Sequence, residues 1–411
     1  MNSDHAHEGV GFYDELKGQP PVGGTRYELE RLRCGLCGAL QTTELPETAG
    51  ESKYDPTVTS IIATLRYGQG MPWNRIQQLQ KSAGIPLPAS VQWELVRDAV
   101  ECGPGDAYQQ LLWEASQGDL MHNDDTPMRI LELSGKLQKD QPVHEDDPQR
   151  RGVFTTNILS VAEGRPTISL FFTGARHAGE NLRDVLIKRL ADLPPPMQMC
   201  DALSRNMPRE LKTTVANCLS HGRRNFYELA DTFPSEVLHV LRCLRIVYRI
   251  DGRAKRKGLS ADDRLRLHQA RSGPVMQHLQ QWLQRQFDER KVEPNSSLGK
   301  AITYMLRHWE KLTLFLRVRG APLDNNICEQ ALKMAIRHRK NSLFYKTRRG
   351  AAVGDLYMSL IHTCYHAQVD PLDYVTQLQR HHQRVEASPG DWLPWNYRQQ
   401  LANTMESAAS H

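Results

Sequence analysis

The sequence has no long hydrophobic run. Every apolar stretch is shorter than the roughly 18 residues that a membrane-spanning helix requires. The opening residues, Met-Asn-Ser-Asp-His-Ala-His-Glu, also lack the basic and then apolar order of a signal peptide. We therefore expect a cytoplasmic protein that makes no contact with a membrane.

Cysteine is too scattered for a disulfide framework. The 411 residues contain eight cysteines, spread from Cys34 to Cys364, whereas disulfide-stabilised proteins are small and dense in cysteine. A reducing compartment is the simpler interpretation.

A large excess of positive charge is also missing. The 52 Lys and Arg against 47 Asp and Glu give a net charge of +5, which alone does not identify a nucleic-acid-binding protein. The basic residues nevertheless cluster, and each cluster is either a solvated helix face or a set of phosphate contacts. One cluster is Arg253–Lys257, which we expect to touch the DNA backbone. The other candidate DNA-binding residues are Arg223, Arg224, Arg339, Lys340, Lys346, Arg348 and Arg349.

The N-terminal region divides into two short segments. Residues 1–30 are polar and rich in Gly and Pro, which predicts a disordered N-terminus. Residues 31–55 contain a short knuckle, Cys34-Gly-Leu-Cys37, with the spacing of half a tetrahedral zinc site. Only His5, His7 or Cys102 could complete such a site, so Cys34 and Cys37 bind Zn²⁺ or form a plain turn.

Residues 56–117 show helical periodicity. The pattern breaks at Gly84-Ile-Pro86 and resumes at Ala89, which is compatible with a helix-turn-helix. Such a module would place its following helix, near Ser90–Trp93, in the major groove of DNA. A helical hairpin without DNA contacts is the alternative.

The period changes from helical to extended after Gly118. Three apolar runs with a turn at Glu163-Gly-Arg predict an antiparallel meander, and a helix over residues 181–190 separates it from two shorter strands. The predicted strands are Met121–Leu133, Val153–Val161, Pro166–Thr173, Met197–Cys200 and Thr213–Leu219. Together they indicate an α/β fold with a mixed sheet flanked by helices.

The rest of the chain is almost entirely helical. Residues 222–321 are predicted to form an all-helical insertion within a catalytic domain made of residues 118–221 and 322–385. A helix over 326–336 carries Glu329, and further helices are expected over 351–368 and 371–380. Residues 386–411 are predicted to be a C-terminal tail consisting of a loop and a polar end.

Three carboxylates are candidates for one site. Asp124 and Asp201 come at the ends of predicted central strands, and Glu329 lies on a helix that could cross the sheet. Their convergence at one rim is how a ribonuclease-H-like fold builds a two-metal site. Two cations about 3.5–4 Å apart activate an attacking hydroxyl and stabilise the leaving oxygen at phosphorus. Each carboxylate alone is weak evidence, because surface Asp and Glu are common.

Several motifs occur together in one order over residues 30–396. His122-Asn-Asp-Asp-Thr-Pro127, Cys218-Leu-Ser-His-Gly-Arg-Arg-Asn-Phe226 and Leu323-Asp-Asn-Asn-Ile-Cys-Glu329 are the strongest, with Arg339–Phe344 and Leu393–Asn396 in support. In these motifs the chain resembles transposases of the insertion-sequence 66 family, which belong to the DDE (Asp, Asp, Glu) class. The family shows His-Ala-Asp-Glu-Thr-Pro at the first motif, so Asp125 stands where it has Glu.

The resemblance implies that Asp124, Asp201 and Glu329 bind Mg²⁺ or Mn²⁺ and are catalytic. His221 either orients the scissile phosphate or a water near these residues, or caps the next helix. The second carboxylate departs from the family pattern, because Ala202 stands where the family has Gly and Leu203 where it has an aromatic residue.

The implied function is metal-dependent cleavage and strand transfer of an insertion sequence. Its partners would be the terminal inverted repeats and target DNA, bound by a homo-oligomer that associates with the nucleoid, with accessory proteins of the element as further candidates. A catalytically impaired transposase-derived DNA-binding protein is one alternative. A metal-dependent nuclease without preference for element ends is another. The intact carboxylate triad favours the transposase.

Overall fold

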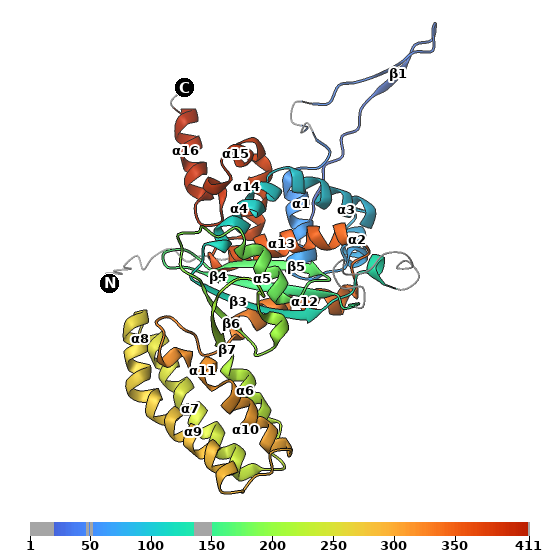
Figure 1. Cartoon of the computed structure of the whole chain (residues 1–411). Helices are drawn as coiled ribbons and strands as arrows, with labels where there is room; N and C mark the ends of the chain where they lie inside the picture. Colours follow the sequence, from blue (N-terminus) through green and yellow to red (C-terminus); the bar gives the residue numbers. More distant parts are fainter. Residues whose placement is uncertain (1–19, 47–48, 50–51, 135–149, 410–411) are drawn as a thin grey trace, which may run out of the picture.

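The centre of the protein is a five-stranded mixed sheet (Figure 1). The structure is a computed structural model and describes residues 20–46, 49, 52–134 and 150–409. The strands run in the order β5-β4-β3-β6-β7, with β3 to β5 antiparallel and β6 and β7 parallel to β3. Their bounds are Leu120–Pro127 (β3), Phe154–Val161 (β4), Ile168–Gly174 (β5), Met197–Cys200 (β6) and Thr214–Asn217 (β7). The predicted α/β fold with a mixed sheet is confirmed, and the topology is consistent with a ribonuclease-H-like fold.

The first predicted strand is too long. It was expected over 121–133, but β3 ends at Pro127, and residues Leu131–Leu133 form a short 3₁₀ turn. This turn is held by the Leu131 N–H, which donates to the carbonyl oxygen of Tyr345 at 2.9 Å. The side chains of Ile130 and Leu133 are buried in this turn. A short apolar run does not by itself distinguish a strand from a buried turn, which is why the strand was predicted to continue to Leu133.

The outer edge of the sheet at β5 is covered by helix α13, Arg348–His366. Alternate N–H groups of β5 point outward, and α13 presents three acceptors at intervals of four residues. The donors Ser169, Phe171 and Thr173 bond Thr363 Oγ1, Ser359 Oγ and Asp355 Oδ2 at 3.1, 2.9 and 2.6 Å. Every second residue of the strand faces every fourth residue of the helix, so side chains of α13 accept the hydrogen bonds of the β5 N–H groups that have no neighbouring strand.

The N-terminal helices pack beside α13 (Figure 1). They are α1 (Pro56–Ala63), a π-helical turn (Thr64–Gly68), α2 (Trp73–Ser82), α3 (Ala89–Asp98) and α4 (Pro104–Ser116). The break between α2 and α3 falls at Gly84, whose φ of 80° is easily reached only by glycine. Tyr67 stacks on Tyr357 of α13 with ring centroids 5.7 Å apart. DNA reading by α3 stays a prediction.

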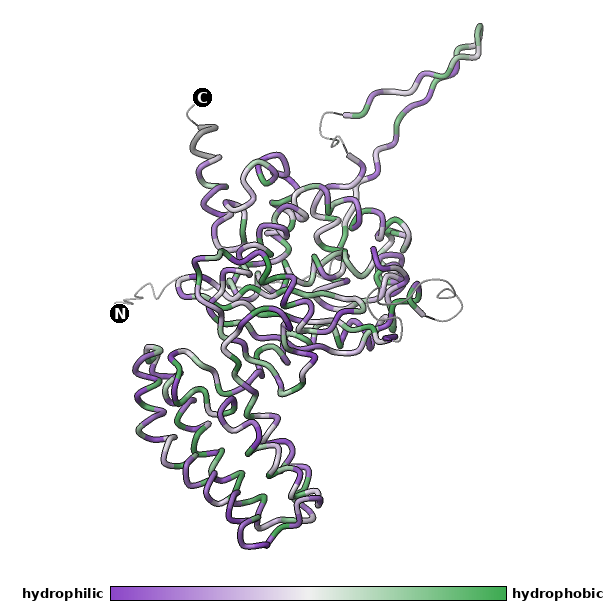
Figure 2. The backbone as a smooth tube through the Cα atoms, in the orientation of Figure 1, coloured by the Kyte–Doolittle hydropathy of each residue, from purple (hydrophilic) through white to green (hydrophobic). Residues whose placement is uncertain are grey.

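A separate helical body projects from the sheet beyond β7 (Figure 1). It has its own apolar core, and Figure 2 shows hydrophilic and hydrophobic segments alternating along its helices. It comprises α6 (Leu219–Tyr227), α7 (Pro234–Arg256), α8 (Ala261–Leu267), α9 (Gly273–Asp288), α10 (Ser297–Arg307) and α11 (Trp309–Leu312). The strand predicted to reach Leu219 ends earlier, because Leu219 opens α6.

The remaining helices close the fold. They are α5 (Ala178–Leu186), α12 (Asn326–Ser342), α14 (Pro371–Arg380), α15 (His382–Ala387) and α16 (Tyr397–Ala409). The loop predicted over Trp392–Asn396 is observed after a 3₁₀ turn that ends at Trp392, whereas the polar tail expected beyond it is the helix α16. Its first residue, Tyr397, is anchored through a 2.7 Å hydrogen bond from its hydroxyl to Asp373, a contact between distant segments that no local pattern predicts.

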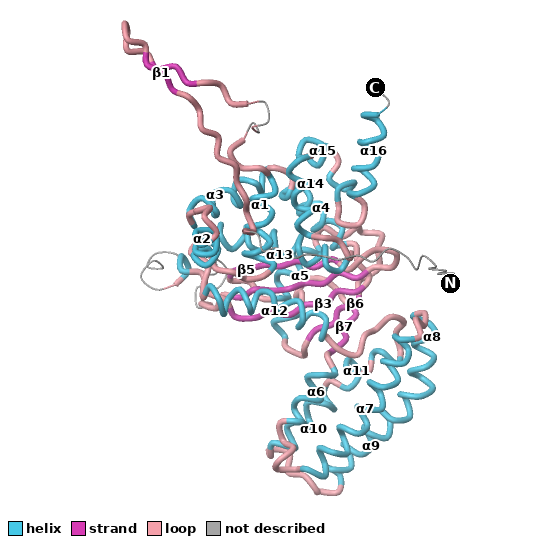
Figure 3. The backbone as a smooth tube through the Cα atoms, turned by 180° about the vertical axis from the view of Figure 1, so that it is seen from behind, coloured by secondary structure: helices cyan, strands magenta, loops and turns pink. Residues whose placement is uncertain are grey.

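The N-terminal residues form a hairpin that extends from the body (Figure 3). Its strands are β1 (Arg31–Arg33) and β2 (Leu40–Thr42). Residues 1–19 of the predicted disordered N-terminus lie outside the described residues, whereas Val22 is buried and exchanges two hydrogen bonds with Gln80. None of the described helices has the length and apolar composition needed to cross a membrane.

Candidate active site

The parallel pairing of β3 and β6 aligns two of the candidate carboxylates. The paired part of the two strands ends at His122 and Met199, and Asp124 and Asp201 each follow two residues further along, so both lie at the same end of this strand pair. Asp201 follows the last residue of β6, and its Oδ1 accepts hydrogen bonds from the Leu203 N–H at 3.1 Å and from the side chain of Asn206. The register of the sheet therefore brings together two residues that are far apart in the sequence.

The third carboxylate is positioned by Asn325, at the start of α12. Its side chain contacts β3 twice, through His122 Nδ1 at 2.9 Å and through a bond donated to the carbonyl oxygen of Asn123 at 3.1 Å. Its own N–H donates to Cys218 Sγ at 3.3 Å. Glu329 lies one helical turn after this anchor. From the sequence, Asn325 is expected to cap the helix; it does stand at the N-cap position, but its side chain bonds β3 instead of the helix N–H groups, which no local pattern reveals.

The site concentrates negative charge in a partly dry environment. Burial raises the pKa of Asp124 to about 7, and repulsion from Asp201, Asp125 and Glu329 adds to that effect, against a hydrogen bond from the Asp125 N–H. Asp201 and Glu329 therefore lie close enough to Asp124 for their negative charges to raise its pKa. A divalent cation bound beside Asp124 would offset this repulsion.

His221 lies beside Glu329 and does not cap the helix. It occupies the first turn of α6, where Cys218 is the capping residue, and its Nδ1 is 3.9 Å from Glu329 Oε1. Both of these atoms are buried without a hydrogen-bond partner in the described part of the chain. With Cys218 they form a group whose ligand atoms lie within 4.8 Å of one another. Because His221 Nδ1 and Glu329 Oε1 are buried, close together and without hydrogen-bond partners among the described residues, they could bind a cation.

Asp125 serves the opposite face of β3. Its side chain is 1% exposed and forms ion pairs with His177 Nδ1 at 3.1 Å and Arg205 Nη2 at 3.4 Å. His177 is the capping residue of α5, so Asp125 ties this helix to the sheet. Alternation along the strand separates its role from that of Asp124.

A basic groove opens beside the carboxylates. It has a volume of about 920 Å³, and Ser220 and Asn326, which adjoin His221 and the Glu329 turn, form one of its walls. The arginine groove, as we name it, is lined by Arg223 of α6 and by Arg245, Arg249, Arg253 and Arg256 of α7. Within the described ranges none of the four α7 arginines forms an ion pair with an acidic side chain. Unpaired guanidinium groups in one hollow make a site for anions.

The other predicted DNA-binding residues are dispersed. Arg224 Nη2 lies 3.8 Å from Glu329 Oε2, and Arg339 bonds Thr126 Oγ1 at 3.1 Å, which holds the end of β3. Lys340, Lys346, Arg348 and Arg349 are exposed around the junction of α12 and α13. In the predicted basic stretch, Lys255 pairs with Asp251 at 3.0 Å, so Arg253 and Arg256 are the members that face the groove.

Cys34 and Cys37 are exposed at the tip of the β1–β2 hairpin. No third ligand joins them within the described residues, where the group formed by Cys218, His221 and Glu329 is the one set of three possible ligands. His5 and His7 lie outside these residues. Zinc binding by the knuckle stays a prediction.

A five-stranded mixed sheet with an acidic rim and a crossing helix places the protein in the ribonuclease-H-like class. The sequence model described as "Transposase IS66 family" matches residues 51–353, and the chain belongs to this family. The family implies a DNA substrate.

Three relatives come from Sinorhizobium fredii (strain NBRC 101917 / NGR234), and all are uncharacterized proteins. The chain is 25% identical to y4hP over 404 residues, which cover 92% of the chain and 69% of the relative. It is 32% identical to y4jD over 192 residues, covering 45% of the chain and 36% of the relative. It is 31% identical to y4qI over 187 residues, covering 45% of the chain and 34% of the relative.

Proposed function

We propose that the protein is an active DDE transposase that cleaves DNA at the ends of its element and joins the freed 3′ hydroxyl to target DNA. The observation that carries the proposal is that Asp124 of β3 and Asp201, just after β6, lie at the same end of two paired strands, to which Asn325 ties the start of the helix that carries Glu329. Family membership supplies the DNA substrate. Asp201 keeps its place in the register although Ala202 and Leu203 replace the usual following residues.

Divalent cations fit the side chains present. Asp124, Asp201 and Glu329 would hold Mg²⁺ or Mn²⁺, because all three offer oxygen ligands, the charges of the other two raise the pKa of Asp124, and Glu329 Oε1 has no hydrogen-bond partner in the described structure. When bound, the cations would lower the pKa of the attacking hydroxyl and stabilise the charge on the leaving oxygen.

The protein's own residues would place the DNA. Arg224 lies next to Glu329, and the arginine groove opens beside it, so guanidinium groups would hold the phosphates on both sides of the scissile bond. His221, beside Glu329, would orient the scissile phosphate or a water near the carboxylates. Terminal inverted repeats as specific ligands, a homo-oligomer on the DNA and accessory proteins belong to the same proposal.

The test compares matched carboxylate variants. Asp124→Asn, Asp201→Asn and Glu329→Gln keep size and remove an anionic ligand, so nicking of DNA from the borders of the coding region in Mg²⁺ or Mn²⁺ should fall by orders of magnitude. Binding to the same DNA in EDTA should persist.

Asp125→Asn is the control, because its ion pairs lie on the other face of β3. Nicking by this variant should stay near that of the unaltered protein. Binding of border DNA without cleavage in either metal would instead favour the impaired DNA-binding protein, and cleavage without preference for the borders would favour a general nuclease.

A further inference from the structure

A second hollow, which we call the tryptophan pocket, lies at the far end of α12 from the carboxylates. Its volume is about 840 Å³, within the range of roughly 300–1,000 Å³ typical of small-molecule sites. Its walls come from the N-terminal helices and from the loop between α12 and α13. They include Trp73, Trp93, Arg66, Phe344, Tyr345 and Lys346.

The pocket combines ring faces with a guanidinium charge that has no counter-ion among the residues the structure describes. The rings of Trp73 and Trp93 meet edge-on with centroids 6.3 Å apart, and the Arg66 guanidinium lies 4.9 Å from the Trp73 ring centroid. Arg66 is 4% exposed; its Nη1 donates to the carbonyl oxygen of Met71 and to the hydroxyl of Ser342, and its guanidinium also lies 5.8 Å from the Tyr67 ring centroid. Its Nε has no partner among the described residues. A buried, unpaired charge is costly, so this arrangement points to an anionic ligand with a flat ring.

The lip of the pocket is strained. Leu343 has a φ of 68° and a ψ of −41°, and the Phe344 N–H donates to the Ser342 carbonyl oxygen at 2.8 Å. This is a γ-turn with positive φ, which is unfavourable for a residue other than glycine. Its side chain is 65% exposed. The strained backbone of Leu343 thus directs its apolar side chain towards solvent. Strained backbone of this kind is concentrated at functional sites.

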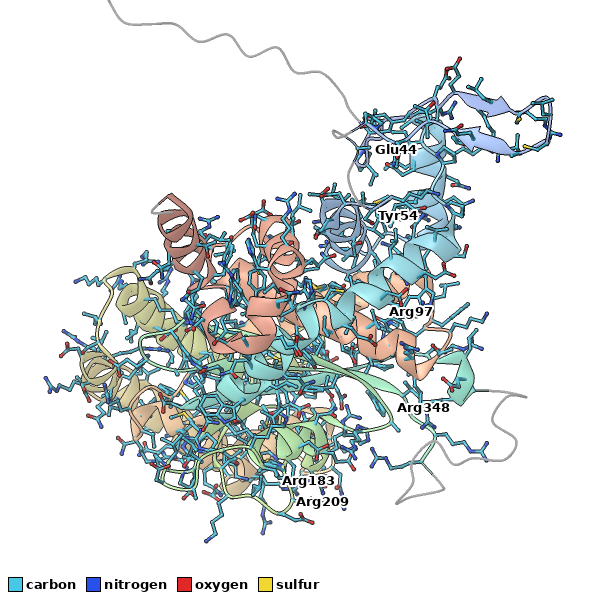
Figure 4. The ribbon with its side chains drawn as sticks, turned by 90° about the horizontal axis from the view of Figure 1, so that it is seen from above. Glu44, Tyr54, Arg97, Arg183, Arg209 and Arg348 are labelled. Atoms are coloured by element: carbon cyan, nitrogen blue, oxygen red, sulfur yellow. The ribbon has the colours of Figure 1, made fainter. Side chains whose placement is uncertain are left out.

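The surroundings are basic. Lys346 lines the pocket, and Arg348 and Arg349 follow at the start of α13. Figure 4 shows Arg348 and Arg97 of α3 on the same side of the molecule, where Arg97 is paired with Asp98 at 2.6 Å. DNA phosphates are the anions that a surface of this kind attracts in a protein whose family acts on DNA.

We propose that the tryptophan pocket receives one unstacked nucleotide of the bound DNA, with its base against the indole rings and its phosphate near Arg66 and Lys346, while Leu343 fills the space that the base leaves. Aromatic faces take up single bases without sequence preference, and apolar side chains are the wedges that unstack a duplex.

The pocket and the carboxylates would engage the same duplex. Glu329 and Ser342 stand at opposite ends of α12, roughly 20 Å apart at about 1.5 Å per residue. At about 3.4 Å per base step this corresponds to about six steps from the cleaved bond. This inference depends on the proposed function in one respect, namely that the ligand is DNA.

The test measures binding in EDTA, which removes catalysis from the result. Three fluorescein-labelled duplexes of one sequence are compared by anisotropy: fully paired, with one extrahelical thymidine, and with one extrahelical abasic sugar. The last two are equally flexible, and only one carries a base. The unaltered protein should bind the thymidine duplex roughly tenfold more tightly than the abasic one, because only the thymidine offers a base that can stack on the indole rings.

Variants assign the preference to the pocket. Trp93→Leu should abolish it, whereas Trp113→Leu, which changes a half-exposed tryptophan of α4 outside the pocket, should keep it. Leu343→Gly relieves the strained turn and is expected to fold. It should weaken binding of the paired duplex and leave binding of the thymidine duplex intact.

Equal affinity for the thymidine and abasic duplexes would overturn the inference, as would a preference that survives both Trp93→Leu and Trp73→Leu. If the protein cleaves border DNA but shows no preference, only the pocket assignment is wrong. If it binds none of the duplexes, the proposed function fails as well.

Discussion

Neutralising the arginine groove should change the salt dependence of DNA binding by an amount that the structure sets. Arg245, Arg249, Arg253 and Arg256 follow one face of α7 at spacings of three or four residues, and all four side chains are exposed in the groove. The perturbation is their simultaneous replacement by Gln, which retains polarity and most of the length of the side chain. Helix propensity changes little with this substitution.

The expected magnitude follows from counterion release. Each phosphate contact contributes about 0.9 to the slope of log Kobs against log salt concentration for duplex DNA. If each of the four arginines meets one phosphate, the slope should become shallower by up to about 3.6. Affinity at low salt should fall for all sequences alike, because backbone contacts carry no sequence information.

The assay is fluorescence anisotropy in EDTA at several salt concentrations. The matched control replaces Arg266, Arg271, Arg285 and Lys300, four exposed basic residues of the same helical body that lie outside the groove. The control removes the same net charge, so a general loss of long-range attraction would affect both variants equally. An unchanged slope in the groove variant, or equal changes in the two variants, would refute the assignment of this groove to DNA.

Three further predictions concern stability and positioning. Burial lowers the pKa of His338 to about 3, and the charge of Arg66 adds to the effect. Below about pH 6.5 the His338 imidazole therefore gains a proton in the unfolded chain, whereas in the folded protein it stays neutral. The free energy of unfolding should then fall as the pH drops towards 3. In urea unfolding, the His338→Phe variant should lack this pH-dependent loss of stability, which is at most about 3 kcal/mol near pH 4. A pH profile of stability that the substitution leaves unchanged would contradict the prediction. Ser359→Ala leaves the Phe171 N–H unpaired at the sheet edge and should cost about 1–3 kcal/mol, with faster hydrogen exchange at that amide; an unaltered exchange rate would show that the edge is satisfied otherwise. Asn325→Ala removes the link between β3 and α12 and should slow nicking by up to roughly a hundredfold at saturating DNA, whereas an unchanged rate would mean that Glu329 is positioned without it.

Periodicity predicted the fold class because each element carries its own pattern. The strands β4 and β6 and the helix α14 were located within a residue of their observed bounds, since apolar alternation or a Pro after an N-cap residue marks them locally. The end of β3 and the helix α16 were not predicted, because contacts with Tyr345 and Asp373 from distant segments decide them.

The sequence by itself determined the family, the mixed α/β architecture and which carboxylates stand in the characteristic motifs, because these properties reside in local residue order. Only the tertiary structure decided what those residues face. The pairing of β3 with β6 puts Asp124 and Asp201 at the same end of two neighbouring strands, and Asn325 ties the start of the helix that carries Glu329 to β3. The packing of α7 turns separate arginines into one groove, and the meeting of α2, α3 and the α12–α13 loop forms the tryptophan pocket. Such contacts depend on how distant faces pack together, a property that no single segment encodes.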